Sequence, residues 1–136
     1  MTDFNASVIE EFRANHGKVG GRWENATLLL LHHTGAKTGT ERVTPLGYQK
    51  VGDSYAIFGS KGGAQVNPAW FHNLVAHPDV TIEVGDETIT AHARVAEPTE
   101  RDVIYARQVE RAPHFGEYAK NAAPRIIPVV ILEPLR

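Results

Sequence analysis

The fold class is decided by the stretch Val80–Val95, which reads VTIEVGDETITAHARV. Apolar and polar side chains alternate on both sides of the central Gly85-Asp86 pair, as is typical of strands with one buried face. Glycine allows the positive φ angle that begins a tight two-residue turn, so we expect the two halves to pair as an antiparallel hairpin. Gly52-Asp53 repeats this signal between Val51 and Ser54, which predicts a second hairpin.

Two segments precede these hairpins. Phe4–His16 carries apolar side chains at helical spacing, and we expect this short amphipathic helix to pack on the domain rather than on a lipid surface. Glycines at positions 17, 20 and 21 end the pattern. Thr27–Thr34 is a continuous leucine-rich run of strand length, which predicts a strand buried on both faces.

Two helices are predicted in the middle of the chain. Asn67 and Pro68 suit a helix cap and a first helical position, so we predict a helix over 69–76 with Asn67 as its cap. A second helix is predicted over 97–111, opened by Thr99 with acidic residues in its first turn.

The C-terminal part completes the pattern. Ala112–Arg125 is rich in turn-forming residues, and Ile126–Leu132 predicts a final strand in which Pro128 requires an edge position or a bulge. Six strands with helices in the crossovers favour a mainly β (α+β) protein, built as a small, partly open antiparallel barrel.

Composition limits the classes of protein that fit. We expect the 136 residues to form a single domain over 1–136, in which 1–26 supply the N-terminal helix and a glycine-containing lead-in. The chain has no cysteine, which excludes disulfides, thiolate metal sites and cysteine nucleophiles. The net charge of −2 offers no basic excess for nucleic-acid binding.

The same sequence bears on location. No apolar run approaches the roughly 20 residues that are needed to cross a bilayer. No basic region precedes an apolar run at the N-terminus, so the sequence does not resemble a secretory signal. We therefore expect a cytoplasmic protein without a transmembrane segment, and peripheral membrane association stays open.

The histidines are poorly spaced for a metal site. His32 and His33 are adjacent and would point to opposite faces of a strand, whereas His72 and His77 would not stack on one helical face. His92 falls on the polar face of its strand, where a solvated histidine is the simpler interpretation. We expect no metal.

Common enzyme motifs are also missing. Ser60 stands between Gly59 and Lys61 without the Gly-x-Ser-x-Gly pattern of a nucleophile elbow, which disfavours a hydrolase but leaves a spatial triad open. The stretch 35–39, GAKTG, has only a fragment of a phosphate-binding P-loop, and the Rossmann glycine pattern is absent.

Three loops remain as the candidate site. The loop over 35–42 offers two cations, a hydroxyl and backbone N–H groups, which suit a phosphate or carboxylate, although an ordinary solvated hairpin loop explains it equally well. The small residues over 59–64 let a flat ligand approach the main chain. The stretch 68–73 places adjacent aromatics at a helix start, where a ring and an anion can both be held. Together the loops favour a phosphorylated planar cofactor.

These segments, in this order, resemble the deazaflavin-dependent nitroreductase family, also described as F420-dependent quinone reductases. The likeness covers about 28–134 and rests on four stretches: GAKTG with RVTPL over 35–46, SKGGA over 60–64, NPAWFHNL over 67–74 and IPVV over 127–130. The resemblance implies a split β-barrel like the FMN-binding barrel of pyridoxamine-phosphate oxidases, with coenzyme F420 as the ligand and a monomer as the favoured state.

The resemblance also implies which residues contact the cofactor. Lys37, Arg42 and Lys61 would meet the phosphate and oligoglutamate tail, and the backbone near Thr44 and Phe58 would line the deazaflavin. The full implied set is Ala36, Lys37, Thr38, Arg42, Val43, Thr44, Pro45, Leu46, Gly47, Phe58, Gly59, Ser60, Lys61, Ala69, Trp70, Phe71, His72 and Asn73.

The sequence departs from the family where nitroreductases cluster tyrosines beside the substrate. Residues 112–118 read APHFGEY, so only Tyr118 keeps a hydroxyl, and Gly47 replaces an aromatic. Nitro compounds are therefore doubtful substrates, and Tyr118 is either a proton donor or a packing wall. We expect a reductase that passes a hydride from reduced F420 to a quinone, enone or nitro compound. The alternatives are a non-catalytic carrier of F420, flavin or lipid, an FMN or haem barrel, and a purely structural barrel.

Overall fold

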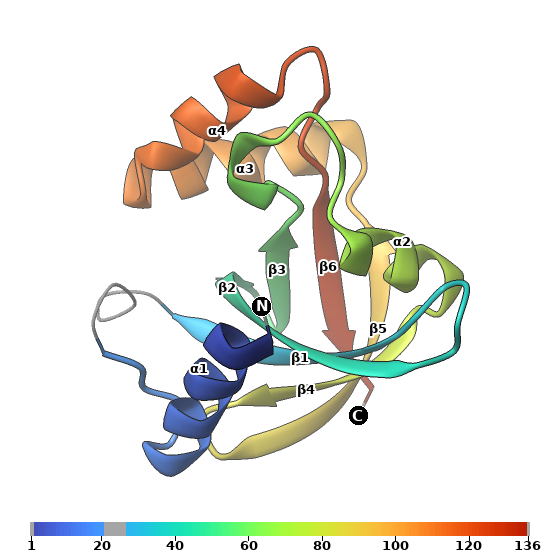
Figure 1. Cartoon of the computed structure of the whole chain (residues 1–136). Helices are drawn as coiled ribbons and strands as arrows, with labels where there is room; N and C mark the ends of the chain where they lie inside the picture. The colour runs from blue at the N-terminus through green and yellow to red at the C-terminus, as the bar shows by residue number, and fades with distance from the viewer. Residues whose placement is uncertain (1, 21–26, 136) are drawn as a thin grey trace.

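Six antiparallel strands close into a ring in the computed structural model, which describes residues 2–20 and 27–135, with side chains from Ala6 onward. The ring runs β1-β2-β3-β6-β5-β4 (Figure 1). The strands are β1 (Leu28–Thr34), β2 (Glu41–Val51), β3 (Ser54–Phe58), β4 (Asp79–Val84), β5 (Glu87–Val95) and β6 (Val129–Pro134). The split-barrel prediction is confirmed, and pairing of β1 with β4 closes a ring that the sequence suggested would be partly open.

Both predicted hairpins form. Val51 pairs with Ser54 and Val84 pairs with Glu87, so each turn has two residues. Gly52 and Gly85 both adopt φ = 59°, the conformation that a primed turn requires at its first central position.

The strands bury side chains on both sides. Leu29, Leu31 and Ile57 belong to the main core cluster, as expected for residues that point into the barrel. Leu28 and Leu30 instead pack with the N-terminal helix, so β1 is buried on both faces, as the leucine run predicts.

The described helices are α1 (Thr2–Ala14), α2 (Ala69–Ala76), α3 (Pro98–Arg111), α4 (His114–Ala122) and the short 3₁₀ helix η2 (Lys61–Gly63). Helices α1, α3 and α4 pack on outer faces of the barrel, whereas α2 contributes Trp70 and Leu74 to the main core cluster. Val8 and Phe12 of α1 are buried against β1, which confirms that this helix packs on the barrel. Residues 21–26 of the expected lead-in and the side chain of Phe4 lie outside the described part. Helices α3 and α4 lie together at the opposite end of the molecule from α1 (Figure 1).

The turn-rich prediction for 112–125 is wrong, because α4 occupies most of it. Proline and glycine suggested turns there, but Phe115, Tyr118, Ala119 and Ala122 repeat at helical spacing and pack into the cluster beneath α3. Tertiary packing of that apolar face outweighs the local turn signals.

Two local predictions are also wrong. Strand β6 begins at Val129, so Pro128 precedes it and β6 lies between β3 and β5 rather than at an edge. The cap of α2 is Pro68, because the side-chain oxygen of Asn67 accepts a hydrogen bond from Arg125 Nη1 at 2.6 Å instead of capping the helix. Helix α3 begins after Glu97, which forms a capping box with Glu100.

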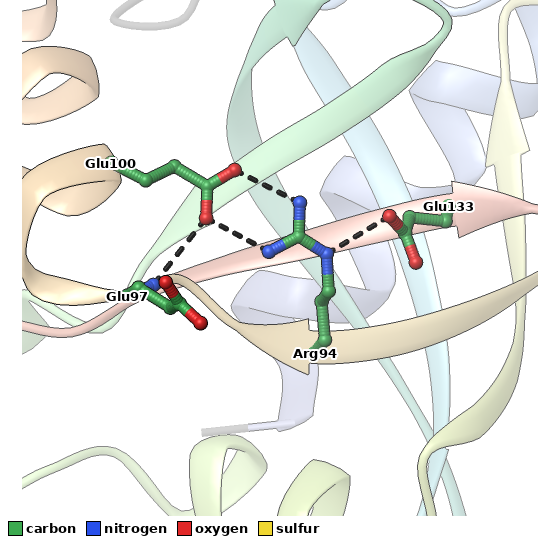
Figure 2. A network of polar contacts seen from close by, with 4 residues as sticks. All are labelled: Arg94, Glu97, Glu100 and Glu133. Carbon is green, nitrogen blue, oxygen red and sulfur yellow. Dashed lines mark hydrogen bonds and ion pairs between the residues drawn. The ribbon is translucent and has the colours of Figure 1, made fainter.

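One arginine ties α3 to the barrel (Figure 2). Arg94 of β5 donates to both oxygens of Glu100 at 2.8 and 2.9 Å, and through Nε to Glu133 of β6 at 2.9 Å. These bonds, with Glu100 first, raise the pKa of Arg94, and the same guanidinium lowers the pKa of Glu100. The bidentate geometry therefore fixes the start of α3 against two strands.

We expect Arg94→Met to lower the free energy of unfolding by about 1 kcal/mol, because the network is half-exposed and water screens it. Urea denaturation measures the loss, and Arg107→Met, an exposed arginine of α3, is the matched control. The pKa of Glu100 is lowered in the folded protein. The difference in unfolding free energy between wild type and Arg94→Met should therefore be present above the ordinary pKa of glutamate, and it should fade as the pH falls through the pKa of Glu100 in the folded protein. An equal loss for both variants would contradict the assignment.

Candidate functional site

A cleft of about 630 Å³ lies between the 35–42 loop, β2 and the start of α2. Its walls are His33, Gly35, Ala36, Lys37, Thr38, Arg42, Thr44, Ala69, Trp70, His72 and Asn73. The first and third predicted loops therefore meet, although they are about thirty residues apart in sequence. The volume is within the range of roughly 300–1,000 Å³ that is typical of small-molecule sites.

A tight turn shapes one wall of the cleft. Gly35 N–H donates to Thr40 O at 2.8 Å, and Gly39 N–H donates to Gly35 O at 3.0 Å. Gly39 has φ = 73°, and a Cβ on Gly35 would approach Thr38 Oγ1 to 2.6 Å. Glycine at these two positions thus lets the loop fold back while Lys37 and Thr38 stay exposed at the cleft.

Helix α2 is tied to this loop by a buried amide. Asn73 is 7% exposed, and its Oδ1 accepts from the backbone N–H of Ala36 at 2.9 Å. Its Nδ2 lies 3.0 Å from His33 Nδ1, and His33 Nε2 lies 2.8 Å from Thr44 Oγ1. One polar chain therefore links the loop, α2, β1 and β2 at the base of the cleft.

The cleft is positively charged at its rim and neutral at its base. Lys37 and Arg42 are exposed and line the cleft. Burial, followed by electrostatic interaction with Arg42 and then with His32, lowers the pKa of His33 to about 4. His33 is thus uncharged near neutral pH, and the cations stay at the mouth, where they can meet an anion without being buried.

The second predicted loop, 59–64, does not line the cleft. It adjoins α2 instead, since a Cβ on Gly59 would lie 3.5 Å from Pro68 Cδ. Gly63 is packed against α4, where an added Cβ would meet Tyr118 Cα at 3.2 Å.

Arg125 holds this second loop in place. Its Nη1 donates to Gly59 O at 2.9 Å and to Asn67, its Nη2 donates to Ser60 O at 3.0 Å, and its Nε donates to Ala64 O at 3.0 Å. Sequence reasoning missed Arg125, because nothing around it distinguishes it from a surface arginine.

The structure places the predicted site residues in two groups. Nine line the cleft: Ala36, Lys37, Thr38, Arg42, Thr44, Ala69, Trp70, His72 and Asn73. The others lie outside its lining: Val43, Pro45, Leu46, Gly47, Phe58, Gly59, Ser60, Lys61, Phe71 and Tyr118.

Several residues of the second group face other parts of the molecule. Val43 packs in the α1 cluster, Leu46 packs on the barrel core, and Phe58 lies beneath α3 and α4. Phe71 lines a separate shallow pocket of about 250 Å³ beside β5. Tyr118 stacks edge-on with Phe115 at 5.2 Å within the α4 cluster.

His33 and Gly35 line the cleft although neither was among the implied cofactor contacts, and only Gly35 belonged to a predicted loop. Strand alternation could have indicated His33, since it follows Leu29 and Leu31 on one face, and a buried polar side chain there needs a partner. Among residues 2–20 and 27–135, no group of three or more histidine, aspartate or glutamate side chains is arranged to hold a metal ion.

Comparison with known proteins gives consistent matches. A family model described as F420H(2)-dependent quinone reductase matches residues 6–134. A Mycobacterium tuberculosis protein named F420H(2)-dependent quinone reductase is 40% identical over 124 residues, which cover 89% of this chain and 83% of that protein.

Solved structures agree. One described as an F420-H2 dependent reductase, FDR-A, superposes with a TM-score of 0.70 and 36% identity over 78% of this chain and 93% of that chain. Another, described as a domain-swapped dimer, has a TM-score of 0.72 and 33% identity over 97% of this chain and 98% of that chain.

We expect Arg125→Lys to lower the free energy of unfolding by about 1–2 kcal/mol, because one ammonium cannot reach the acceptors that the guanidinium bridges. Arg111→Lys, at the exposed end of α3, is the matched control, and chemical denaturation measures both. The same stability for both variants would show that Arg125 does not hold the loop.

Proposed function

Since the chain belongs to the family of F420H(2)-dependent quinone reductases, we propose that the cleft between the 35–42 loop and α2 is where it binds coenzyme F420. The protein is an oxidoreductase with F420 as its cofactor and a quinone as its acceptor. The observation that carries the site proposal is the pair of exposed cations, Lys37 and Arg42, at the mouth of a cleft with an uncharged polar base.

The donor set suits this cofactor. Lys37, Arg42 and the Thr38 hydroxyl offer charge-assisted hydrogen bonds to phosphate and carboxylate oxygens, which abound in the F420 tail. Trp70 supplies an aromatic wall. The loop over 59–64, held by Arg125, adjoins the start of α2 and supplies small residues where a flat ring could extend beyond the cleft.

Reduced F420, when bound, supplies a hydride from C5 of its deazaflavin ring, and the quinone also needs one proton to become a quinol. No side chain of the cleft has to act as a nucleophile. Lys37 and Arg42 would hold the cofactor, and Trp70 and α2 would orient its ring and exclude water from one face. His33 would not donate a proton near neutral pH, because it is already uncharged.

The acceptor range is a finer proposal. We infer that quinones and enones are reduced in preference to nitro compounds, because the segment over 112–118 carries only one tyrosine. Tyr118 lies in α4 against η2, outside the lining of the cleft. Its role as proton donor remains a prediction.

Assembly and location also remain predictions. The sequence resemblance favours a monomer, whereas one solved relative is described as a domain-swapped dimer. Within the described part of the chain, no helix is long and apolar enough to span a membrane. A cytoplasmic location, a single-domain organisation and peripheral membrane association are left as hypotheses.

We expect Lys37→Ala and Arg42→Ala each to weaken F420 binding by about 1–3 kcal/mol, roughly 5- to 150-fold, because each removes a charge-assisted bond. Fluorescence titration measures the affinity, which should fall as salt is added, and FMN should bind much more weakly than F420. Lys50→Ala is the matched control, since Lys50 is an exposed cation of β2 that lies outside the cleft. Unchanged, salt-insensitive binding in both variants would place the tail elsewhere.

We expect Tyr118→Phe to leave F420 affinity unchanged and to slow enone reduction by about 10- to 100-fold, if its hydroxyl donates the proton. Quinone reduction should be less sensitive, because a quinol oxygen can take its proton from water. Stopped-flow oxidation of bound reduced F420 measures both rates. An unchanged rate of enone reduction would show that Tyr118 only packs against its neighbours. If the wild type does not oxidise bound reduced F420 with any acceptor, the non-catalytic carrier is favoured.

A further inference from the structure

The buried polar chain at the base of the cleft has a defined donor direction. It begins at the backbone N–H of Ala36, which can only donate, so the atom that it meets at 2.9 Å on Asn73 is the amide oxygen. The amide nitrogen of Asn73 must then face His33, 3.0 Å from Nδ1. Because an amide nitrogen only donates, His33 Nδ1 accepts.

This direction selects the tautomer of His33. The ring is only 4% exposed, and burial, together with Arg42 and His32, keeps its pKa near 4. A neutral imidazole that accepts at Nδ1 carries its hydrogen on Nε2. That hydrogen points to Thr44 Oγ1, 2.8 Å away, so the threonine hydroxyl is the acceptor in this bond.

Thr44 therefore has its own hydrogen left to donate. Thr44 lines the cleft, and within residues 2–20 and 27–135 the structure gives its hydroxyl no hydrogen-bond partner other than His33. Because Thr44 Oγ1 already accepts the hydrogen bond from His33, the hydroxyl can donate its own hydrogen to a ligand oxygen.

We propose that His33 is a positioning residue that makes the Thr44 hydroxyl a hydrogen-bond donor into the cleft, toward a carbonyl or phosphate oxygen of the bound cofactor. The identity of the ligand in this inference rests on the proposed function, whereas the tautomer of His33 is independent of that function. The chain Ala36–Asn73–His33–Thr44 ties the donor to the same loop that carries Lys37, so the loop and the donor are set together.

The tautomer can be tested without any cofactor. In ¹⁵N-labelled protein, long-range ¹H–¹⁵N correlation spectra should show His33 with hydrogen on Nε2, an unprotonated Nδ1 and no titration between pH 5 and 8. Charged or titratable neighbours that could disturb this are Arg42 and His32, with His72 and Lys37 on the same cleft. Asn73→Leu removes the donor to Nδ1 and should mix the two tautomers. A wild type with hydrogen on Nδ1, or one that titrates near pH 6.5, overturns the proposal.

The donor role is tested on F420 affinity. We expect Thr44→Val to weaken binding by about 3- to 10-fold and Thr44→Ser to retain wild-type affinity, because only the former loses the hydroxyl. His33→Phe should weaken binding similarly alone but add nothing in the Thr44→Val background, since both act through one donor. Thr90→Val, on the exposed face of β5, is the control for a threonine-to-valine change.

The source of the ligand oxygen follows from a second titrant, the deazaflavin nucleoside that lacks the phosphate-bearing tail. Losses for both ligands assign the donor to a ring carbonyl, and a loss for F420 alone assigns it to a phosphate oxygen. Wild-type affinity in Thr44→Val, with weakened binding in Lys37→Ala, overturns the donor role while the proposed function stands. A wild type that does not bind F420 overturns both.

Discussion

Pairing of β6 with β3 on one side and β5 on the other is the constraint on which the remaining structure depends. The last strand of the chain joins the two hairpins that the glycine turns create, and without it neither hairpin would have its second neighbour. Its residues alternate between the barrel interior, through Val130 and Leu132, and the outer face, through Val129 and Ile131. That outer face is what α3 and α4 cover.

Strand β1 also alternates between two sides of the barrel, and it places the polar side chains of His32 and His33 on opposite sides. His32 faces outward, where its Nε2 lies 2.6 Å from Glu83, which also binds Arg13 of α1. The Arg13 hydrogen bond lowers the pKa of Glu83, so this carboxylate stays charged and links α1 to the barrel. His33 faces the other way, into the cleft. The two adjacent histidines therefore have different partners: His32 contacts Glu83, and His33 contacts Asn73 and Thr44.

The parts of the fold that local chemistry determines could be predicted from the sequence. Gly52 and Gly85 specify turns that only their backbone freedom allows, and the run over 28–31 could be buried only in a strand with two covered faces. Helix α4 could not be predicted from turn signals, because its stability comes from contacts of Phe115 and Tyr118 with residues distant in sequence. The prediction of Asn67 as a helix cap is wrong for the same reason, since its hydrogen-bond partner Arg125 is 58 residues away.

The candidate site follows this division. The cations and glycines of the 35–42 loop mark it as a candidate for anion binding, but a solvated hairpin loop explains the same residues equally well, and only the family resemblance assigned Lys37 and Arg42 to a cofactor tail. Strand alternation could indicate that His33 faces inward, but its hydrogen-bonding role could not be predicted, because that role depends on Asn73 and Thr44 from two other elements. The net charge of −2 for the whole chain also does not reveal the local positive charge of Lys37 and Arg42 at the rim of the cleft. A charged group at its base would be costly to bury, so the base uses neutral donors and acceptors while the cations remain hydrated at the rim. An anionic ligand would therefore meet charge first and directional hydrogen bonds second, with orientation set by the buried groups and attraction by the exposed ones.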